Sequence, residues 1–325
     1  MAIFAPACIH AEPAKTPAQA AERGLDFLIK DANKWREEKQ CSTCHHGTMT
    51  VWALTEAKSQ GYAVKAETLA DMTKWTKDRL LEKIDLPRDK RPGFSMVNTP
   101  AMNLSLMAIA IPKQEALSAD ELKRIAGHLF RHQEEDGSFA WSSAPAANRP
   151  PPFFESDEIA TLLGYMALSP HVPSDPKEKS EARDRRDKAA AWLAKSESTD
   201  TTQAIAYRLF RDVRAERPAK EVQSSTDALL KRQNKDGGWG QVKDAHSDAY
   251  ATGQALYFLR LAGLKNDRDE LKRGVAFLVS TQNDDGSWLM KRRGHPGVTP
   301  SNNIWPITYF GSAWGVMGLA RAGGK

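Results

Sequence analysis

Apolar residues recur along most of the chain at the spacing of an α-helix, in segments of two alternating kinds. Segments of the first kind carry charges along one face, as in ELKRIAGHLFRHQ from Glu121, which predicts helices with one solvent-exposed side. Segments of the second kind are apolar nearly all round, as in SAWGVMGLARAG from Ser312, which predicts buried helices. The alternation therefore predicts an all-α protein with two layers of helices.

One turn motif recurs in three of these segments: leucine, then glutamine, then Asp-Gly, then an aromatic residue. The copies are HLFRHQEEDGSFAW from His128, ALLKRQNKDGGWG from Ala228 and AFLVSTQNDDGSW from Ala276. The glutamines of the copies stand 100 and 49 positions apart, which indicates a repeating unit of about fifty residues. Asp-Gly ends the first helix of each unit, because glycine readily adopts the left-handed conformation found after helix ends.

This template predicts six helical hairpins that close into one domain, residues 19–325. The charged first helices are expected at 19–34, 66–84, 119–133, 184–196, 219–233 and 268–282. The apolar second helices are expected at 48–60, 99–111, 156–169, 200–213, 247–263 and 307–322. Six outer and six inner helices make an (α/α)6 barrel with a central cavity.

The repeated Gln-x-x-Asp-Gly-Ser-Trp pattern resembles the QW motif of squalene-hopene cyclases, which prenyltransferase β-subunits share in looser form. This resemblance extends from about residue 20 over most of the chain, and it implies the terpenoid cyclase-like α/α toroid. The zinc ligands of the prenyltransferases have no counterpart, because no cysteine follows Cys44.

The cyclases carry an Asp-x-Asp-Asp motif before an inner helix, and its middle aspartate protonates the polyene substrate. ESDEIATLLG aligns with this motif as Glu-x-Asp-Glu, so the resemblance implies Asp157 as the catalytic acid between Glu155 and Glu158. The flanking acids differ from the motif, and SDAYAT repeats the same pattern at Asp248. A helix N-cap role for Asp157 is therefore the alternative.

The first hairpin has CSTCHHG, which includes Cys41, Cys44, His45 and His46, in place of the Asp-Gly turn. Cys-x-x-Cys-His resembles the attachment signature of c-type haem, in which two thiols bond to the porphyrin and the histidine binds the iron. The resemblance implies haem c at the rim of the cavity, held by Cys41, Cys44 and His45. Its role would be electron transfer with a redox partner protein, or redox or binding chemistry at the haem.

Three other interpretations of this motif stay open. Zinc could be bound by the two cysteines and His45 or His46, with His246 or His295 as a remote ligand. A disulfide could join the two cysteines, or both could be free thiols. His246 and His295 are also candidates for the sixth iron position if haem is present.

The ends and the composition narrow the picture further. Residues 1–18 resemble the remnant of a signal peptide or a disordered tail, and the former predicts an exported, periplasmic protein. No apolar run reaches the ~18 residues of a membrane-spanning helix. The net charge of +5 is modest and the basic runs lack interleaved aromatics, so no nucleic-acid partner is expected.

These observations leave three functional hypotheses. The leading one is an exported toroid with covalent haem c. The first alternative is an isoprenoid cyclase, or a protein that binds an apolar small molecule in the cavity, with Asp157 as the acid. The second is a scaffold with a Cys/His zinc site.

Overall fold

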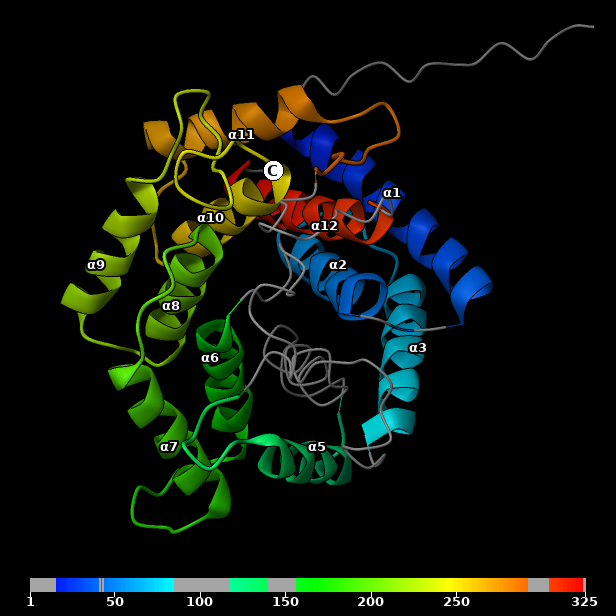
Figure 1. Ribbon diagram of the computed structural model, residues 1–325. Helices are drawn as coiled ribbons and strands as arrows, with labels where there is room; N and C mark the ends of the chain where they lie inside the picture. The colour runs from blue at the N-terminus through cyan, green and yellow to red at the C-terminus, as the bar shows by residue number, and fades with distance from the viewer. Residues whose placement is uncertain are drawn as a thin grey trace, which may run out of the picture.

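The chain forms a ring of helices in two concentric layers, as the computed structural model in Figure 1 shows. The structure describes residues 16–40, 42, 44–84, 117–139, 156–291 and 304–323. Within these residues it contains no β-strand, only three isolated β-bridges. The predicted all-α fold class is therefore confirmed.

The outer layer contains all six predicted first helices. They are α1 (Pro17–Lys39), α3 (Ala66–Ile84), α5 (Ala119–His132), α7 (Glu181–Lys195), α9 (Ala219–Leu230) and α11 (Asp269–Thr281). The inner layer contains five of the predicted second helices. They are α2 (Thr50–Ser59), α6 (Asp157–Leu168), α8 (Thr202–Arg214), α10 (Ala249–Leu261) and α12 (Trp305–Ala322). The inner helix predicted at 99–111 lies outside the described residues.

Two short helical segments adjoin the inner layer. A π-helical turn, η1 (Cys44–Met49), leads directly into α2, and a 3-10 turn, η5 (Ser169–His171), follows α6. Because π-helical turns occur often at functional sites, η1 marks the first hairpin as unusual.

The glutamine of each repeated turn joins its own hairpin to the next one. Its side-chain Nε2 donates one hydrogen bond to the carbonyl of the turn glycine and another to a carbonyl in the following outer helix. The sets are Gln133 with Gly137 and Arg185, Gln233 with Gly237 and Glu270, and Gln282 with Gly286 and Ala20. The last set connects the C-terminal hairpin to α1, so it closes the ring.

The aromatic residue of each turn joins the outer layer to the inner one. Phe139, Trp239 and Trp288 are at most 2% exposed. The backbone N–H of each donates to a hydroxyl on an inner helix, at distances of 2.8 to 3.0 Å. The acceptors are Thr161, Thr252 and Ser312. The repeated residues therefore serve the architecture of the ring.

Aromatic side chains pack against one another inside the inner layer. They come from α2, α8, α10 and α12, and they are Trp52, Tyr207, Phe210, Tyr257, Phe258 and Trp314. Their ring centroids lie 5.0 to 6.4 Å apart, and each residue is at most 2% exposed. This aromatic cluster therefore joins four of the inner helices.

Candidate functional site

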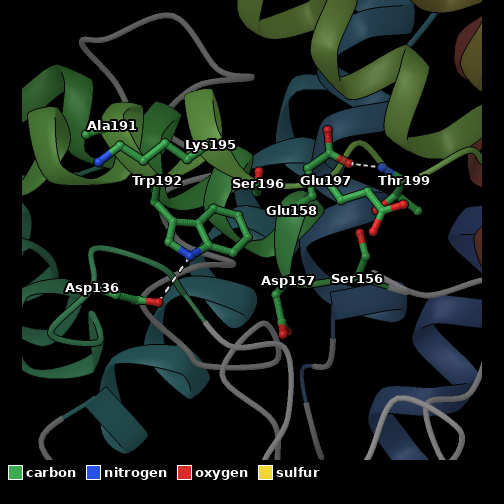
Figure 2. A pocket seen from close by; sticks show the side chains of 10 residues that line it. All are labelled: Asp136, Ser156, Asp157, Glu158, Ala191, Trp192, Lys195, Ser196, Glu197 and Thr199. Atoms are coloured by element: carbon green, nitrogen blue, oxygen red, sulfur yellow. Dashed lines mark hydrogen bonds between the residues drawn. The ribbon is translucent and has the colours of Figure 1, made fainter.

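A pocket of about 630 Å³ opens where α6 begins and α7 ends. Figure 2 shows the side chains that line it, which come from the turn after α5, the start of α6, the end of α7 and the segment between α7 and α8. They are Asp136, Ser156, Asp157, Glu158, Ala191, Trp192, Lys195, Ser196, Glu197 and Thr199. The structure therefore places the candidate acid Asp157 in a pocket.

The acids around Asp157 do not all face the same space. Asp157 is the first residue of α6, and Ser156 rather than Asp157 is the N-cap, because its hydroxyl accepts from the N–H of Ile159. Glu158 points the opposite way from Asp157 in Figure 2. Its carboxylate accepts from Arg208 at 2.5 Å and from the N–H of Thr199 at 2.6 Å.

The carboxylate of Glu158 is thus held in an ion pair with Arg208. Glu155 lies outside the described residues. Asp136, at the other side of the pocket, accepts from the Ser138 hydroxyl at 2.7 Å and from Trp192 Nε1 at 3.1 Å. The hydrogen bonds from Ser138 lower the pKa of Asp136, so this carboxyl stays ionised. Asp157 and Glu158 both lie at the start of α6 and line the pocket. Of these two carboxyls, Asp157 is the one that takes no part in the ion pair with Arg208.

The two histidines of the CSTCHHG motif lie in a second cluster, between the first and last hairpins. His46 is fully buried, and its ring stacks between Trp35, 4.4 Å away, and Tyr309, 3.7 Å away. His46 Nε2 lies 2.9 Å from Asp31 Oδ2, which also accepts from Trp305 Nε1 at 2.6 Å. These contacts fix both the position and the orientation of the His46 ring.

His45 is linked to this carboxylate through His46. Its Nδ1 is hydrogen-bonded to Nδ1 of His46. With Asp31 ionised, His46 holds its proton on Nε2, so His46 Nδ1 accepts from His45 Nδ1 and the lone pair of His45 falls on Nε2. Burial lowers the pKa of both histidines, and proximity to His46 lowers that of His45 further. A neutral imidazole with its lone pair on Nε2 can bind a metal or accept a proton.

The remaining candidate ligands do not join this cluster in the described part of the chain. Cys41 and His295 lie outside it, and Cys44 begins η1 but its side chain is not described. His246 is exposed in the loop before α10. Among the described residues, no group of three or more His, Cys, Asp or Glu side chains could hold a metal ion. The haem and zinc sites therefore stay predictions.

Sequence reasoning missed Asp31 and Trp35, the partners of His46 on α1. The predicted helix ended at residue 34, whereas α1 continues to Lys39. Their spacing of four residues, on a helix that ends just before the motif, was the available signal. Trp305 and Tyr309 reach the cluster only because the last hairpin packs against the first.

Part of the chain resembles known cyclases in sequence. Residues 177–281 match the squalene-hopene cyclase N-terminal domain. The squalene-hopene cyclase of Zymomonas mobilis is 30% identical over 107 residues, which cover 32% of this chain and 16% of that protein. The drimenyl diphosphate synthase of Streptomyces showdoensis is 29% identical over 180 residues, which cover 53% of this chain and 33% of that protein. The chain therefore spans only a minor part of the curated relatives it matches.

Solved structures resemble nearly the whole ring. A variant of the type II terpene cyclase MstE from Scytonema, in complex with geranylgeranyl dihydroxybenzoate, aligns with a TM-score of 0.61 at 13% identity. The alignment covers 94% of this chain and 98% of that one. A Klebsiella pneumoniae protein described as a possible member of the GH105 family has the same TM-score at 11% identity, with 99% and 98% covered.

At these identities the solved structures establish the fold alone. Among the described residues, no helix is both long and apolar enough to cross a membrane. The predicted resemblance to cyclases is confirmed at the level of architecture: the described residues form a cyclase-like α/α toroid.

Proposed function

We propose that this protein binds an isoprenoid-type apolar ligand and acts on it as a terpene cyclase-like enzyme, with Asp157 as the acid. The observation that carries this proposal is the sequence similarity to squalene-hopene cyclases and to drimenyl diphosphate synthase, on a chain whose fold matches a type II terpene cyclase. The position of Asp157 in a pocket at the start of an inner helix supports it.

The chemistry needs a proton donor and a dry, aromatic surface. The carboxyl of Asp157 would donate its proton to one carbon of a double bond, which leaves a cation on the other carbon. A second double bond of the same molecule would then attack this cation, which closes a ring and moves the positive charge to a new carbon. Loss of a proton from the neighbouring carbon to water would form a new double bond and give the neutral product, and Asp157 would regain its proton from solvent. Aromatic faces stabilise cations by about 0.5–2 kcal/mol each, and Trp192 is the aromatic residue among those that line the pocket of Asp157.

The test is product analysis by gas chromatography and mass spectrometry after incubation with squalene and with geranylgeranyl diphosphate. We expect cyclised product from the wild type and none from Asp157→Asn. Glu197→Gln is the matched control in the same pocket, and it should retain activity. Equal product from the wild type and Asp157→Asn would refute the role of this acid.

As a second candidate function, we propose that Cys41, Cys44 and His45 hold haem c in an exported electron-transfer protein. The observation that favours it is the chain of hydrogen bonds from Asp31 through His46 to His45, because iron-binding histidines commonly have their other nitrogen held in this way. The bound group would supply electron transfer, and Asp31 and His46 would orient the ring of His45.

Haem staining of denatured protein, made in an exporting host with haem-attachment machinery, tests this second proposal. Haem that stays with the wild type and is lost in Cys41→Ala/Cys44→Ala supports it. A colourless protein with one zinc per chain supports the zinc site instead. A colourless and metal-free protein removes both.

A further inference from the structure

Gln254 is a buried glutamine whose side-chain amide makes no hydrogen bond to any residue that the structure describes. It lies on α10 with 0% exposure, and neither Oε1 nor Nε2 has a partner among the residues that the structure describes. Two neighbouring inner helices show the same feature. Gln203 Oε1 on α8 and Trp314 Nε1 on α12 are also buried there without a partner. Because buried polar atoms are nearly always hydrogen-bonded, these atoms indicate a group that binds between the three helices.

Contacts with neighbours of Gln254 on α10 relate the three side chains to one another. Gln203 donates from Nε2 to the hydroxyl of Tyr250, which stands one helical turn before Gln254. Trp314 packs against Phe258, one turn after Gln254, with ring centroids 5.4 Å apart. Residues four apart share one face of a helix and lie about 6 Å apart. Gln203 and Trp314 therefore contact residues one turn before and one turn after Gln254 on the same face of α10.

Aromatic residues flank Gln254 along α10. Tyr250 and Phe258 stand one turn before and one turn after it, and both α8 and α12 pack against α10. Arg321 of the neighbouring α12 is already paired with Glu56, because their side chains bond each other at 2.6 Å. A phosphate or carboxylate would have to be buried here without a cation, which is strongly unfavourable.

The unpartnered atoms complement a neutral hydroxyl group. A hydroxyl donates one hydrogen bond and accepts two. Gln254 Oε1 can accept that one bond, and the two N–H groups at Gln254 Nε2 and Trp314 Nε1 can donate the other two. We propose that Gln254 and Trp314 bind the hydroxyl group of an apolar alcohol, a polyprenol, inside the inner layer. This inference rests on the proposed isoprenoid-binding function and narrows its ligand from hydrocarbons and diphosphates to alcohols.

The experiment compares geranylgeraniol with the hydrocarbon of the same skeleton that lacks the hydroxyl, and with geranylgeranyl diphosphate. Binding is followed by tryptophan fluorescence, because Trp314 and Trp52 lie in the aromatic cluster. We expect the wild type to bind the alcohol about tenfold more tightly than the hydrocarbon, the equivalent of one net hydrogen bond. The diphosphate should bind more weakly than the alcohol.

Gln254→Leu should lose the preference for the alcohol while it keeps its affinity for the hydrocarbon. Without ligand, its melting temperature should equal or exceed that of the wild type, because leucine removes two unpaired polar atoms. Gln223→Leu is the control, since Gln223 is an exposed glutamine of an outer helix, and it should bind as the wild type does.

Equal affinity for alcohol and hydrocarbon, or a preference that survives in Gln254→Leu, would overturn the hydroxyl site and leave the proposed function standing. A melting temperature of Gln254→Leu clearly below that of the wild type would also overturn it, because the amide must then have an internal partner. If none of the three compounds binds, both the site and the proposed function fail.

Discussion

The contact between the last repeated turn and α1, which closes the ring, can be tested by replacing one glycine with alanine. Gly286, in the last repeated turn, has φ of +88°, and a Cβ atom there would lie 2.8 Å from the carbonyl carbon of Arg23 on α1 and closer still to its oxygen. Gly61, which follows α2, has a similar φ of +84°, but no atom of the described residues lies within 4 Å of its Cβ position. Gly61→Ala therefore isolates the backbone effect, and Gly286→Ala adds the clash.

The magnitudes follow from these two environments. A positive φ costs alanine about 1–2 kcal/mol. The stiffer unfolded chain returns about 0.4–1 kcal/mol, so Gly61→Ala should destabilise by about 1 kcal/mol. Gly286→Ala must also move α1 away from the turn. That weakens the bond from Gln282 Nε2 to the carbonyl of Ala20 and the two bonds from Arg23 to carbonyls of the turn.

At about 1 kcal/mol for each weakened hydrogen bond, Gly286→Ala should lose roughly 3–4 kcal/mol in total. Urea unfolding followed by tryptophan fluorescence measures the free energy of unfolding of both variants against the wild type. If the two variants differ by less than about 0.5 kcal/mol, the last hairpin does not press on α1 as described, and the explanation of ring closure is wrong.

Three further changes test other parts of the structure. Trp239→Ala and Trp288→Ala should each lower the free energy of unfolding by about 3–5 kcal/mol, because both rings are buried. A loss near zero in urea unfolding, as for an exposed side chain, would contradict this. Glu158→Gln should destabilise by about 1–3 kcal/mol, because it leaves the partly buried guanidinium of Arg208 without its carboxylate partner, and 1 M salt should not reproduce the loss. Burial raises the pKa of Asp248 to about 6. As the pH falls, this carboxylate therefore binds a proton near pH 6 in the folded state but only near pH 4 in the unfolded chain. The wild type should therefore be less stable than Asp248→Asn at pH 7, by on the order of 1–2 kcal/mol, and the gap should close as the pH falls from 6 to 4 in thermal melts. If the difference in stability between the wild type and Asp248→Asn grew as the pH fell, the raised pKa of Asp248 would be refuted.

The parts of the fold that the sequence predicted depend on local signals. The six outer helices and the three Asp-Gly turns follow from periodicity and from glycine, which act within a few residues of the chain. The partners of Gln133 and Gln233 in the next outer helix could not be inferred, because the sequence around a glutamine does not indicate which distant carbonyl will accept its hydrogen bond. The repeat did show that all three glutamines have the same role.

The candidate site was predicted less completely for the same reason. Asp157 and His45 were each predicted from a short motif, whose residues lie within a few positions of one another. Asp31 contacts His46 from 15 residues before it, outside the motif. Tyr309 contacts His46 from the last inner helix, so that contact exists only once the ring is closed. Trp192 likewise enters the pocket from an outer helix with no motif of its own.

The bond from Gln282 to Ala20 spans 262 positions of the chain, which has a consequence for how the protein folds. Contacts of such long range form late, because a large loop must close before they contribute. During synthesis, the face of α1 that carries Leu25 and Leu28 has to wait for α12, the helix that covers it, to be made. Until then the nascent chain presents an open row of hairpins with an uncovered apolar edge. The ring is thus most vulnerable to aggregation just before its last hairpin is complete.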